Sequence, residues 1–303
     1  MDIHPDQLAD LPTEALIAAL PDFLAQHIVD ASARSAAAED TRACVSAWST
    51  QDAESVRDHL LTLGSDIVVY RAHPLLRVLS RGWCKPLFTE LDVHGVPHLA
   101  GALQSGPVVI VGNHMAYVDS QATDAALALA GHADLADRMV TVAGPKVYES
   151  LFRRFAAGCL STLPVPQSGA VSTADVSPRE LAKRAIRSWG HARELTQAGD
   201  ILQIYPEGTR TRTGHMGSFL KGVHRYVGHE GCRIVPMAHG GTDQMYPLDA
   251  DRLTPAPYAI RFLEPIVVAD AGGSRAALEA AWHAIAEALP ERLKPEADTV
   301  PLA

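Results

Sequence analysis

The chain has 303 residues, a formal net charge of −9, 47 % hydrophobic residues and 20 % charged residues. This balance is typical of a folded protein with a full core, and it confines the expected disorder to the first few residues and to residues 297–303. The negative charge, without a block of Lys and Arg interleaved with aromatic residues, excludes nucleic acid from the expected partners.

The cysteines and the hydrophobic pattern indicate the cellular compartment of the protein. Cys44, Cys84, Cys159 and Cys232 lack the paired spacing of a zinc site or a redox pair, so we expect reduced thiols in the core of a cytoplasmic protein. The N-terminus is acidic where a signal peptide is basic, and no apolar stretch approaches the ~20 residues that span a bilayer. We therefore expect no signal peptide and no membrane-spanning helix.

The first part of the chain is predicted to be helical. Over residues 5–80, apolar residues recur three and four positions apart, and Ser49-Thr50-Gln51-Asp52 is typical of a helix start. Gly82 and Pro86 interrupt this pattern. We therefore predict a helical N-terminal region over residues 1–88 and an α/β domain over residues 89–303.

Short β-rich segments alternate with helical ones in the second part. Strands are expected at residues 91–94, 107–112, 139–143, 201–205, 233–237 and 259–263, and helices at residues 119–130, 177–198, 219–228 and 274–289. Such alternation predicts an α/β fold in which a mixed, mostly parallel sheet is flanked by helices.

An imidazole and a carboxylate follow the predicted strand at residues 107–112. His114 stands two positions after this strand, and Asp119 follows five positions later. Loops after strands carry active-site groups in α/β folds, and a carboxylate that orients an imidazole makes it a general base near neutral pH. The simpler interpretation is that Asp119 caps the helix that begins there, and one carboxylate can do both.

A second polar motif follows the predicted strand at residues 201–205. It reads Pro206-Glu207-Gly208-Thr209-Arg210-Thr211-Arg212. Two arginines at alternate positions are suited to binding one phosphate through bidentate hydrogen bonds. The alternative is a polar turn with its glycine at positive φ and its arginines in solvent.

In this order, the two motifs resemble those of the glycerol-phosphate and lysophosphatidic-acid acyltransferase superfamily. That family carries Asn-His-x-x-x-x-Asp after a strand and later Pro-Glu-Gly-Thr-Arg, which here are Asn113-His114 to Asp119 and Pro206 to Arg210. Shorter family-like segments stand at residues 91–95, 235–237 and 263–266. The resemblance covers roughly residues 90–270.

The resemblance implies an O-acyltransferase of phospholipid biosynthesis. His114 would take the proton of the acceptor hydroxyl as it attacks the thioester of acyl-CoA or acyl carrier protein, with Asp119 orienting the imidazole. No serine or cysteine stands in a nucleophile-elbow context, so transfer is expected to be direct, with no metal and no cofactor besides the acyl donor. Backbone amides near Gly208 and Thr209 are candidates for stabilising the oxyanion.

The acceptor is expected to be a lipid alcohol with a phosphate. Its phosphate would be bound by Arg210, Arg212 and Lys146, while Glu207 would position Arg210 or a glycerol hydroxyl. The Glu-Gly-Thr-Arg segment resembles the lysophosphatidate enzymes. The second arginine resembles the soluble plastid glycerol-3-phosphate enzymes, which also have a helical N-terminal domain. We favour lysophosphatidate and keep glycerol 3-phosphate as the alternative.

The chain departs from the family pattern at two places. Ala116 stands where the family usually has Ser or Thr, and residues 159–166, the expected counterpart of a strand that ends in an arginine, contain none. These departures favour an alternative hypothesis, a relative that binds lipid without catalysis. A third hypothesis is a metal-dependent hydrolase with His114 and Asp119 as ligands, which would need more ligands, such as His239 and Asp243.

A lipid substrate also implies contact with a membrane surface, which would place the protein on the inner face of the membrane. Residues 68–88 combine apolar side chains with Arg71, Arg77, Arg81 and Lys85, and are suited to an interfacial surface. An ordinary core helix with a solvated face is the equal alternative. Residues 152–155, Phe-Arg-Arg-Phe, pose the same choice.

Overall fold

The computed structural model describes residues 12–64, 66–166 and 177–303. The N-terminal helices are α1 (Thr13–Ala25), α2 (Ala31–Ser46), α3 (Thr50–Thr62) and α4 (Pro74–Cys84), and a 3₁₀ turn, Lys85–Leu87, follows α4. Ser49 caps α3 as the sequence predicts, because its side chain accepts from the backbone N–H of Asp52 while Asp52 accepts from that of Ser49.

The strands and helices then alternate. The strands are β1 (Phe88–His94), β2 (Val108–Gly112), β3 (Met139–Ala143), β4 (Ser161–Pro164), β5 (Ile201–Ile204), β6 (Arg233–Gly240), β7 (Ala256–Phe262) and β8 (Ile266–Val267). The helices are α5 (Val96–Ser105), α6 (Asp119–Leu129), α7 (Ala133–Asp137), α8 (Leu151–Gly158), α9 (Pro178–Gln197), α10 (His224–Val227), α11 (Thr242–Met245) and α12 (Ser274–Ala288).

The strands form one mixed sheet in the order β1-β7-β6-β2-β5-β3-β4, with β8 paired to β6. Strands β2 to β6 run parallel to one another, while β7 runs antiparallel to β6 and parallel to β1. The predicted fold class is therefore confirmed. Because β2 and β5 are parallel neighbours, the loops that follow them leave the same edge of the sheet, where α/β proteins bind ligands.

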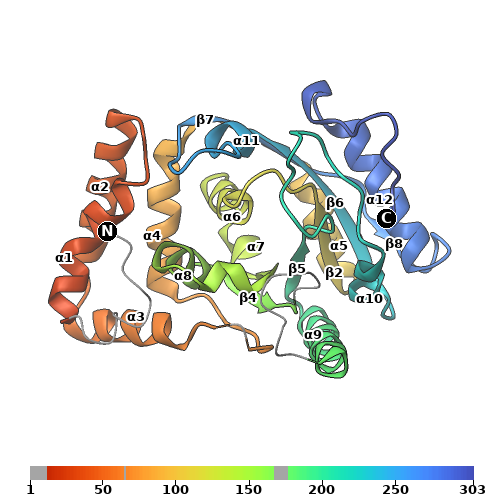
Figure 1. The fold of residues 1–303 in the computed structure, drawn as a ribbon, viewed down its shortest axis with the longest axis horizontal. Helices are drawn as coiled ribbons and strands as arrows, with labels where there is room; N and C mark the ends of the chain where they lie inside the picture. The colour runs from red at the N-terminus through yellow and green to blue at the C-terminus, as the bar shows by residue number, and fades with distance from the viewer. Residues whose placement is uncertain (1–11, 65, 167–176) are drawn as a thin grey trace.

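Helices cover both faces of the sheet (Figure 1). Helices α9, α10 and α12 pack on one face, whose core includes Val109, Val111 and Leu202. Helices α5, α6 and α7 cover the other face over the alternate side chains, such as Val108 and Ile110. This burial on both faces explains why β2 is apolar at every position instead of alternating.

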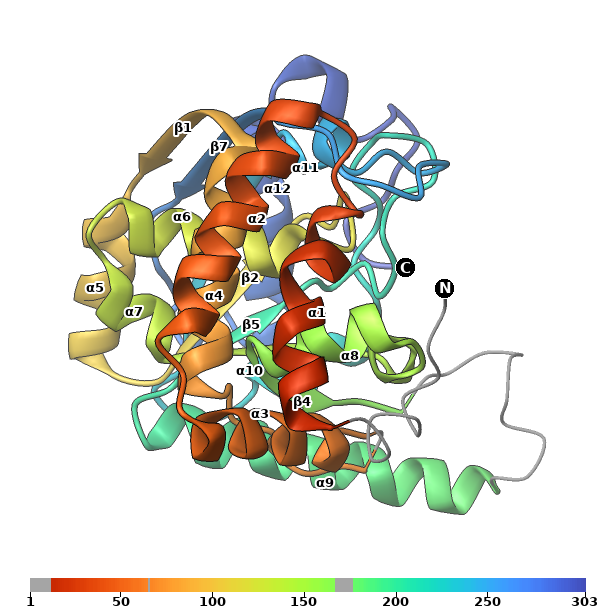
Figure 2. The same cartoon turned by 90° about the vertical axis from the view of Figure 1, so that its left-hand side faces the viewer.

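The N-terminal helices pack beside α6 and α8 (Figure 2). Their shared core joins residues of α1 to α4 with residues of α6 and α8, and Tyr70 pairs with Thr162 of β4. The predicted boundary at residues 88 and 89 coincides with the start of β1. The division into two domains remains a prediction.

Residues 68–88 pack mostly into the core, although Val68 and Val78 are 44 % and 60 % exposed. Arg77 is buried within 4.0 Å of Asp124 and Asp137, and Arg81 forms a two-point ion pair with Asp124. The apolar side chains Leu76, Leu79, Trp83 and Leu87 are buried as well. The structure supports the core-helix interpretation, because Asp124 and Asp137, which follow far later in the chain, form ion pairs with these arginines. Contact of this segment with a membrane remains a prediction.

The Phe-Arg-Arg-Phe segment also turns its aromatic side chains inward. Phe155 is buried, and Phe152 stacks on His27 and lies edge-on to Trp83. These rings form part of the core between α1, α4 and α8. The described residues include no helix that is long and apolar enough to cross a membrane.

The structure differs from the predictions near the C-terminus. Residues 297–303 are ordered instead of disordered, because the backbone of Phe219 bonds to Pro301 and Ala303. The same bonds hold Phe219 in an extended conformation, so the predicted helix at residues 219–228 is reduced to a 3₁₀ turn, Lys221–Val223, and the short α10. The first residues of the chain, also predicted to be disordered, lie outside the described part.

Candidate active site

The loop between β2 and α6 brings His114 and Asp119 together. The Nδ1 atom of His114 lies 2.8 Å from Oδ2 of Asp119. The Asp119 carboxylate is buried, whereas the imidazole of His114 is 19 % exposed. A carboxylate only accepts hydrogen bonds, so Nδ1 carries the proton and Nε2 of the neutral ring has a free lone pair. The pair predicted from the sequence therefore has the geometry of an oriented general base.

Asp119 also shapes the loop that carries His114. Its carboxylate accepts from the backbone N–H groups of Met115 and Ala116, at 2.7 and 3.0 Å. Burial acts to raise the pKa of Asp119, but His239 and the hydrogen bond from His114 outweigh it, so the pKa lies below its ordinary value. Asp119 therefore stays ionised at neutral pH. Ala116, the departure from the family pattern, contributes a backbone amide to this carboxylate.

Glu207 ties the second motif to the first. Its Oε1 accepts from the backbone N–H of His114 at 2.7 Å, and its Oε2 accepts from that of Gly217 at 2.8 Å. Burial raises the pKa of Glu207 to about 7, although both hydrogen bonds act to lower it. Among the described residues, its side-chain hydrogen bonds go to these amides and none goes to Arg210. Glu207 therefore positions the backbone of His114, which the sequence did not predict.

Gly208 makes the sharp turn that the simpler interpretation of the second motif predicted. Its φ is +71°, and a Cβ atom there would stand 2.4 Å from the side chain of Leu220. The Gly208 N–H donates to the carbonyl of Tyr205. This amide is therefore engaged in the turn, which removes it as a candidate donor to an oxyanion.

A clamp between β2 and β6 holds the base of the His114 loop. The Asn113 side chain donates to the carbonyl of His239 and accepts from its N–H, both at 3.0 Å. Nε2 of His239 lies 2.6 Å from the carbonyl oxygen of Asn113, which can only accept, so this nitrogen carries a proton. The same nitrogen is 3.8 Å from Oδ2 of Asp119. A buried imidazole thus supports the carboxylate from behind.

The arginines of the second motif line a polar cavity. Arg210 and Arg212 border a cavity of about 330 Å³ together with Thr209, Glu207 and Glu296. Arg210 donates to the carbonyl of Leu248, and its guanidinium lies 4.4 Å from the centre of the Tyr117 ring. The structure thus places both predicted arginines at one opening, which Thr209 also lines.

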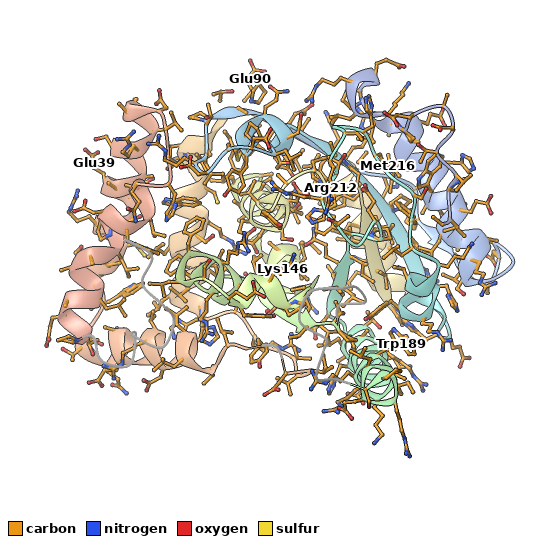
Figure 3. All side chains as sticks on the ribbon, in the orientation of Figure 1. Glu39, Glu90, Lys146, Trp189, Arg212 and Met216 are labelled. Atoms are coloured by element: carbon orange, nitrogen blue, oxygen red, sulfur yellow. The ribbon has the colours of Figure 1, made fainter. Side chains whose placement is uncertain are left out.

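Lys146 lies in the 3₁₀ turn Pro145–Tyr148 that follows β3, while Arg212 lies in the loop that follows β5 (Figure 3). Strands β3 and β5 are neighbours, so both segments leave the same edge of the sheet. The backbone carbonyl of Lys146 accepts from Arg153 of α8. Lys146 is not part of the cavity lined by Arg210 and Arg212.

The sequence reasoning missed the roles of three residues of the site, and it named His239 only as a possible metal ligand. The ring of Tyr205 stacks on His114 with centroids 4.6 Å apart, Tyr117 lies beneath Arg210 and Arg153, and His239 completes the clamp on Asn113. Tyr205 and Tyr117 stand inside or beside the two motifs, so position alone was an available signal. His239 lies near the end of β6, at the same edge of the sheet, but nothing in its local sequence indicates Asn113 as its partner.

No group of three or more His, Cys, Asp and Glu side chains among the described residues is suited to holding a metal ion. His239 and Asp243, the extra ligands considered for a hydrolase, are engaged elsewhere. His239 donates to Asn113, and Asp243 accepts from Arg292 and from the N–H of Gly241. The four cysteines are free thiols, and Cys84, Cys159 and Cys232 are buried as expected.

Both motifs of the site lie in the part of the chain that resembles known acyltransferases. A family model described as Acyltransferase matches residues 90–240, which include both motifs. A 1-acyl-sn-glycerol-3-phosphate acyltransferase of Cocos nucifera is 34 % identical over 79 residues, 26 % of this chain and 26 % of that protein. One of Limnanthes douglasii is 35 % identical over 83 residues, 27 % of this chain and 30 % of that protein. The matched segments thus span less than a third of either relative.

A solved structure supports the fold. The 1-acyl-sn-glycerophosphate (LPA) acyltransferase PlsC from Thermotoga maritima superposes with a TM-score of 0.50 over 70 % of this chain and 76 % of that chain, at 15 % sequence identity. At this identity the likeness concerns the fold alone. The family match, which includes both motifs, shows that residues 90–240 belong to the acyltransferase family.

Proposed function

We propose that the protein transfers a fatty acyl group from an acyl thioester, acyl-CoA or acyl carrier protein, to the free hydroxyl of 1-acylglycerol 3-phosphate. The observation that carries the proposal is the oriented His114–Asp119 pair, joined through Glu207 to the loop whose Arg210 and Arg212 line a polar cavity. The relatives named above are acyltransferases for this acceptor, which supports the choice of acceptor over glycerol 3-phosphate.

Direct transfer of the acyl group needs only one proton to move, and His114 can both accept and return it. Nε2 of His114 takes the proton of the acceptor hydroxyl while its oxygen attacks the thioester carbonyl carbon. The imidazolium that forms is stabilised by ionised Asp119 at 2.8 Å. When the tetrahedral intermediate collapses, the carbon–sulfur bond breaks and the proton passes from His114 to the leaving thiolate. Ester and free thiol are the products, and His114 returns to its neutral form.

The stacked ring of Tyr205 contributes to this chemistry. It covers one face of the imidazole, with an angle of 23° between the two ring planes. Together with the bond to Asp119, this contact restricts rotation of the ring about its side-chain bonds. The base is therefore held in place before the acceptor binds, which lowers the entropic cost of reaching the transition state.

We also propose that the protein meets its lipid acceptor at a membrane surface, on the cytoplasmic side as the sequence suggested, through helix α9. The exposed face of α9 carries Arg179, Lys183, Arg187 and Arg193 around Ile186, which is 62 % exposed. In Figure 2, α9 projects from the body of the molecule at the lower right. Helix α9 directly precedes β5 and packs on it, so the helix runs in the direction opposite to the strand. The first turns of α9 therefore lie toward the end of β5 that leads to Glu207.

The test is the release of free thiol from palmitoyl-CoA by the purified protein. Parallel reactions contain 1-acylglycerol 3-phosphate, glycerol 3-phosphate or no acceptor. We expect release that depends on 1-acylglycerol 3-phosphate and is abolished by His114→Ala, with unchanged circular dichroism of the variant. Palmitoyl–acyl carrier protein replaces palmitoyl-CoA in a second series, which identifies the donor.

The other possible results of this assay would change the assigned acceptor or refute the proposal. Release only with glycerol 3-phosphate would assign the alternative acceptor. Activity that survives His114→Ala would refute the general-base role. If neither donor yields free thiol with either acceptor, the protein is the non-catalytic lipid-binding relative that the lack of an arginine in residues 159–166 favours.

A further inference from the structure

Two arginines from distant segments lie over one exposed tyrosine beside the catalytic pair. The guanidinium carbon of Arg153, in α8, is 5.0 Å from the centre of the Tyr117 ring, and that of Arg210 is 4.4 Å from it. Tyr117 stands three residues after His114 and is 41 % exposed. Cation–π contacts of this geometry orient guanidinium groups while leaving their N–H donors free.

The scaffold around Tyr117 is held to the catalytic loop. The N–H of Thr211, next to Arg210, donates to the carbonyl of His114 at 2.8 Å. Arg153 is held by the turn that follows β3, because its Nη1 donates to the carbonyl of Lys146 at 3.5 Å. Two cationic side chains, one from the loop after β5 and one from α8, therefore converge on the loop that carries His114.

These cations lack the acidic partners that other arginines of the chain have. Arg77, Arg81 and Arg71 each form ion pairs with aspartates. Within the described residues, neither Arg153 nor Arg210 has a carboxylate within 4.0 Å. This is notable because acidic residues outnumber basic ones in the chain, 35 to 26. The described hydrogen bonds of both arginines go to backbone carbonyls.

Holding two guanidinium groups against one ring brings like charges together, which costs energy unless an anion lies near both. A phosphate group satisfies that requirement best, since it carries up to two negative charges and accepts bidentate hydrogen bonds from arginine. Arg153 lies in α8, before β4, and reaches Tyr117 only in the folded chain.

We propose that Arg153, held over Tyr117 beside Arg210, also binds the phosphate of the acceptor. The proposal rests on the proposed function, because it assigns the acceptor's phosphate to this site. Arg153 is a binding residue in this scheme and takes no part in proton transfer.

The neighbouring Arg154 provides a matched control. It belongs to the same helix, but its Nε and Nη2 both donate to the carbonyl of Tyr148 at 3.2 Å. Replacing it removes the same charge from the same helix without touching the Tyr117 site. Any effect of general electrostatics or of α8 stability should therefore appear in both variants.

The experiment measures binding and turnover separately. Calorimetry compares a short-chain 1-acylglycerol 3-phosphate with the matching monoacylglycerol, which lacks the phosphate, for the wild type, Arg153→Ala and Arg154→Ala. We expect Arg153→Ala to raise the Kd of the phosphate-bearing ligand about 10- to 100-fold, as for loss of a charge-assisted contact, and to leave monoacylglycerol binding unchanged. In turnover, KM should rise while kcat changes little.

A further variant keeps the proposal falsifiable if Arg153→Ala is unstable. Arg153→Lys keeps the charge without the planar guanidinium, so it should raise the Kd of the phosphate-bearing ligand less than loss of the charge does. Equal losses in Arg153→Ala and Arg154→Ala, or equal losses for both ligands, would overturn the proposal. Phosphate-dependent binding without any acyl transfer would refute the proposed function while leaving this site intact.

Discussion

Burial and backbone contacts set the properties of Glu207. Its carboxylate is 8 % exposed and accepts from the amides of His114 and Gly217. Gly217 permits this approach, since a Cβ atom there would stand 3.1 Å from Oε2 of Glu207. A carboxyl group whose pKa is raised to about 7 links the stability of the active-site loops to pH near neutrality.

Glu207→Gln should flatten the pH dependence of stability. The folded protein binds the Glu207 proton more tightly than the unfolded chain does, so stability is fully present below the unfolded pKa and falls as pH rises from 4.5 to about 7. The shift corresponds to about 3 kcal/mol at most. Urea unfolding across this window measures the slope for wild type and variant. Parallel curves for the two proteins would contradict the assignment.

At the scale of elements, the site depends on the clamp between the ends of β2 and β6. Three hydrogen bonds join Asn113 to His239, both of which are buried. Strands β2 and β6 are parallel neighbours, so their following loops leave the sheet side by side. The clamp converts this proximity into a fixed position for the His114 loop.

His239→Leu and His239→Gln should separate packing from hydrogen bonding. Leucine fills the space but leaves the buried carbonyl of Asn113 without the donor at Nε2, whereas the glutamine amide can still donate. We expect kcat to fall about 10- to 100-fold in His239→Leu, with a small change in KM and partial recovery in His239→Gln. Thermal unfolding of both variants controls for stability. Equal kcat values in the two variants would exclude positioning through this hydrogen bond.

At the scale of the whole molecule, cationic side chains are distributed unevenly. Arg77 and Arg81 are neutralised inside the protein, while α9 carries its cations on the surface around Ile186. Arg225 adds a further cation beside this face, 4.5 Å from the ring centre of Trp189. A chain with a net charge of −9 thus has, among its described residues, a local cationic surface that fits the proposed contact with anionic headgroups.

Charge reversal on α9 tests the membrane contact. At about 1 kcal/mol for each cation near an anionic surface, Lys183→Glu/Arg187→Glu should weaken binding to vesicles containing phosphatidate on the order of 30-fold or more. The control Arg42→Glu/Arg275→Glu makes the same change in net charge on α2 and α12. Vesicle sedimentation measures the bound fraction, and activity on a dispersed short-chain acceptor should stay unchanged. Equal binding by the two double variants would refute the role of α9.

The sequence by itself determined the elements whose signals are local. Local signals of this kind are the apolar run of β2 and the cap at Ser49, which mark a strand and a helix. The sequence also predicted the pairing of His114 with Asp119, because these residues are only five positions apart. It also identified Glu207, Arg210 and Arg212, because their motif is contiguous.

Only the tertiary structure decided which distant groups meet. It directed Glu207 to the backbone of His114 and joined Asn113 to His239. It also paired Arg77 and Arg81 with the buried Asp124 and placed Arg153 over Tyr117. Each of these contacts joins residues from separate elements, so no local pattern of hydrophobicity or turn residues encodes it. The order of strands in the sheet brings those elements to one edge, and the buried polar groups there then require one another as partners.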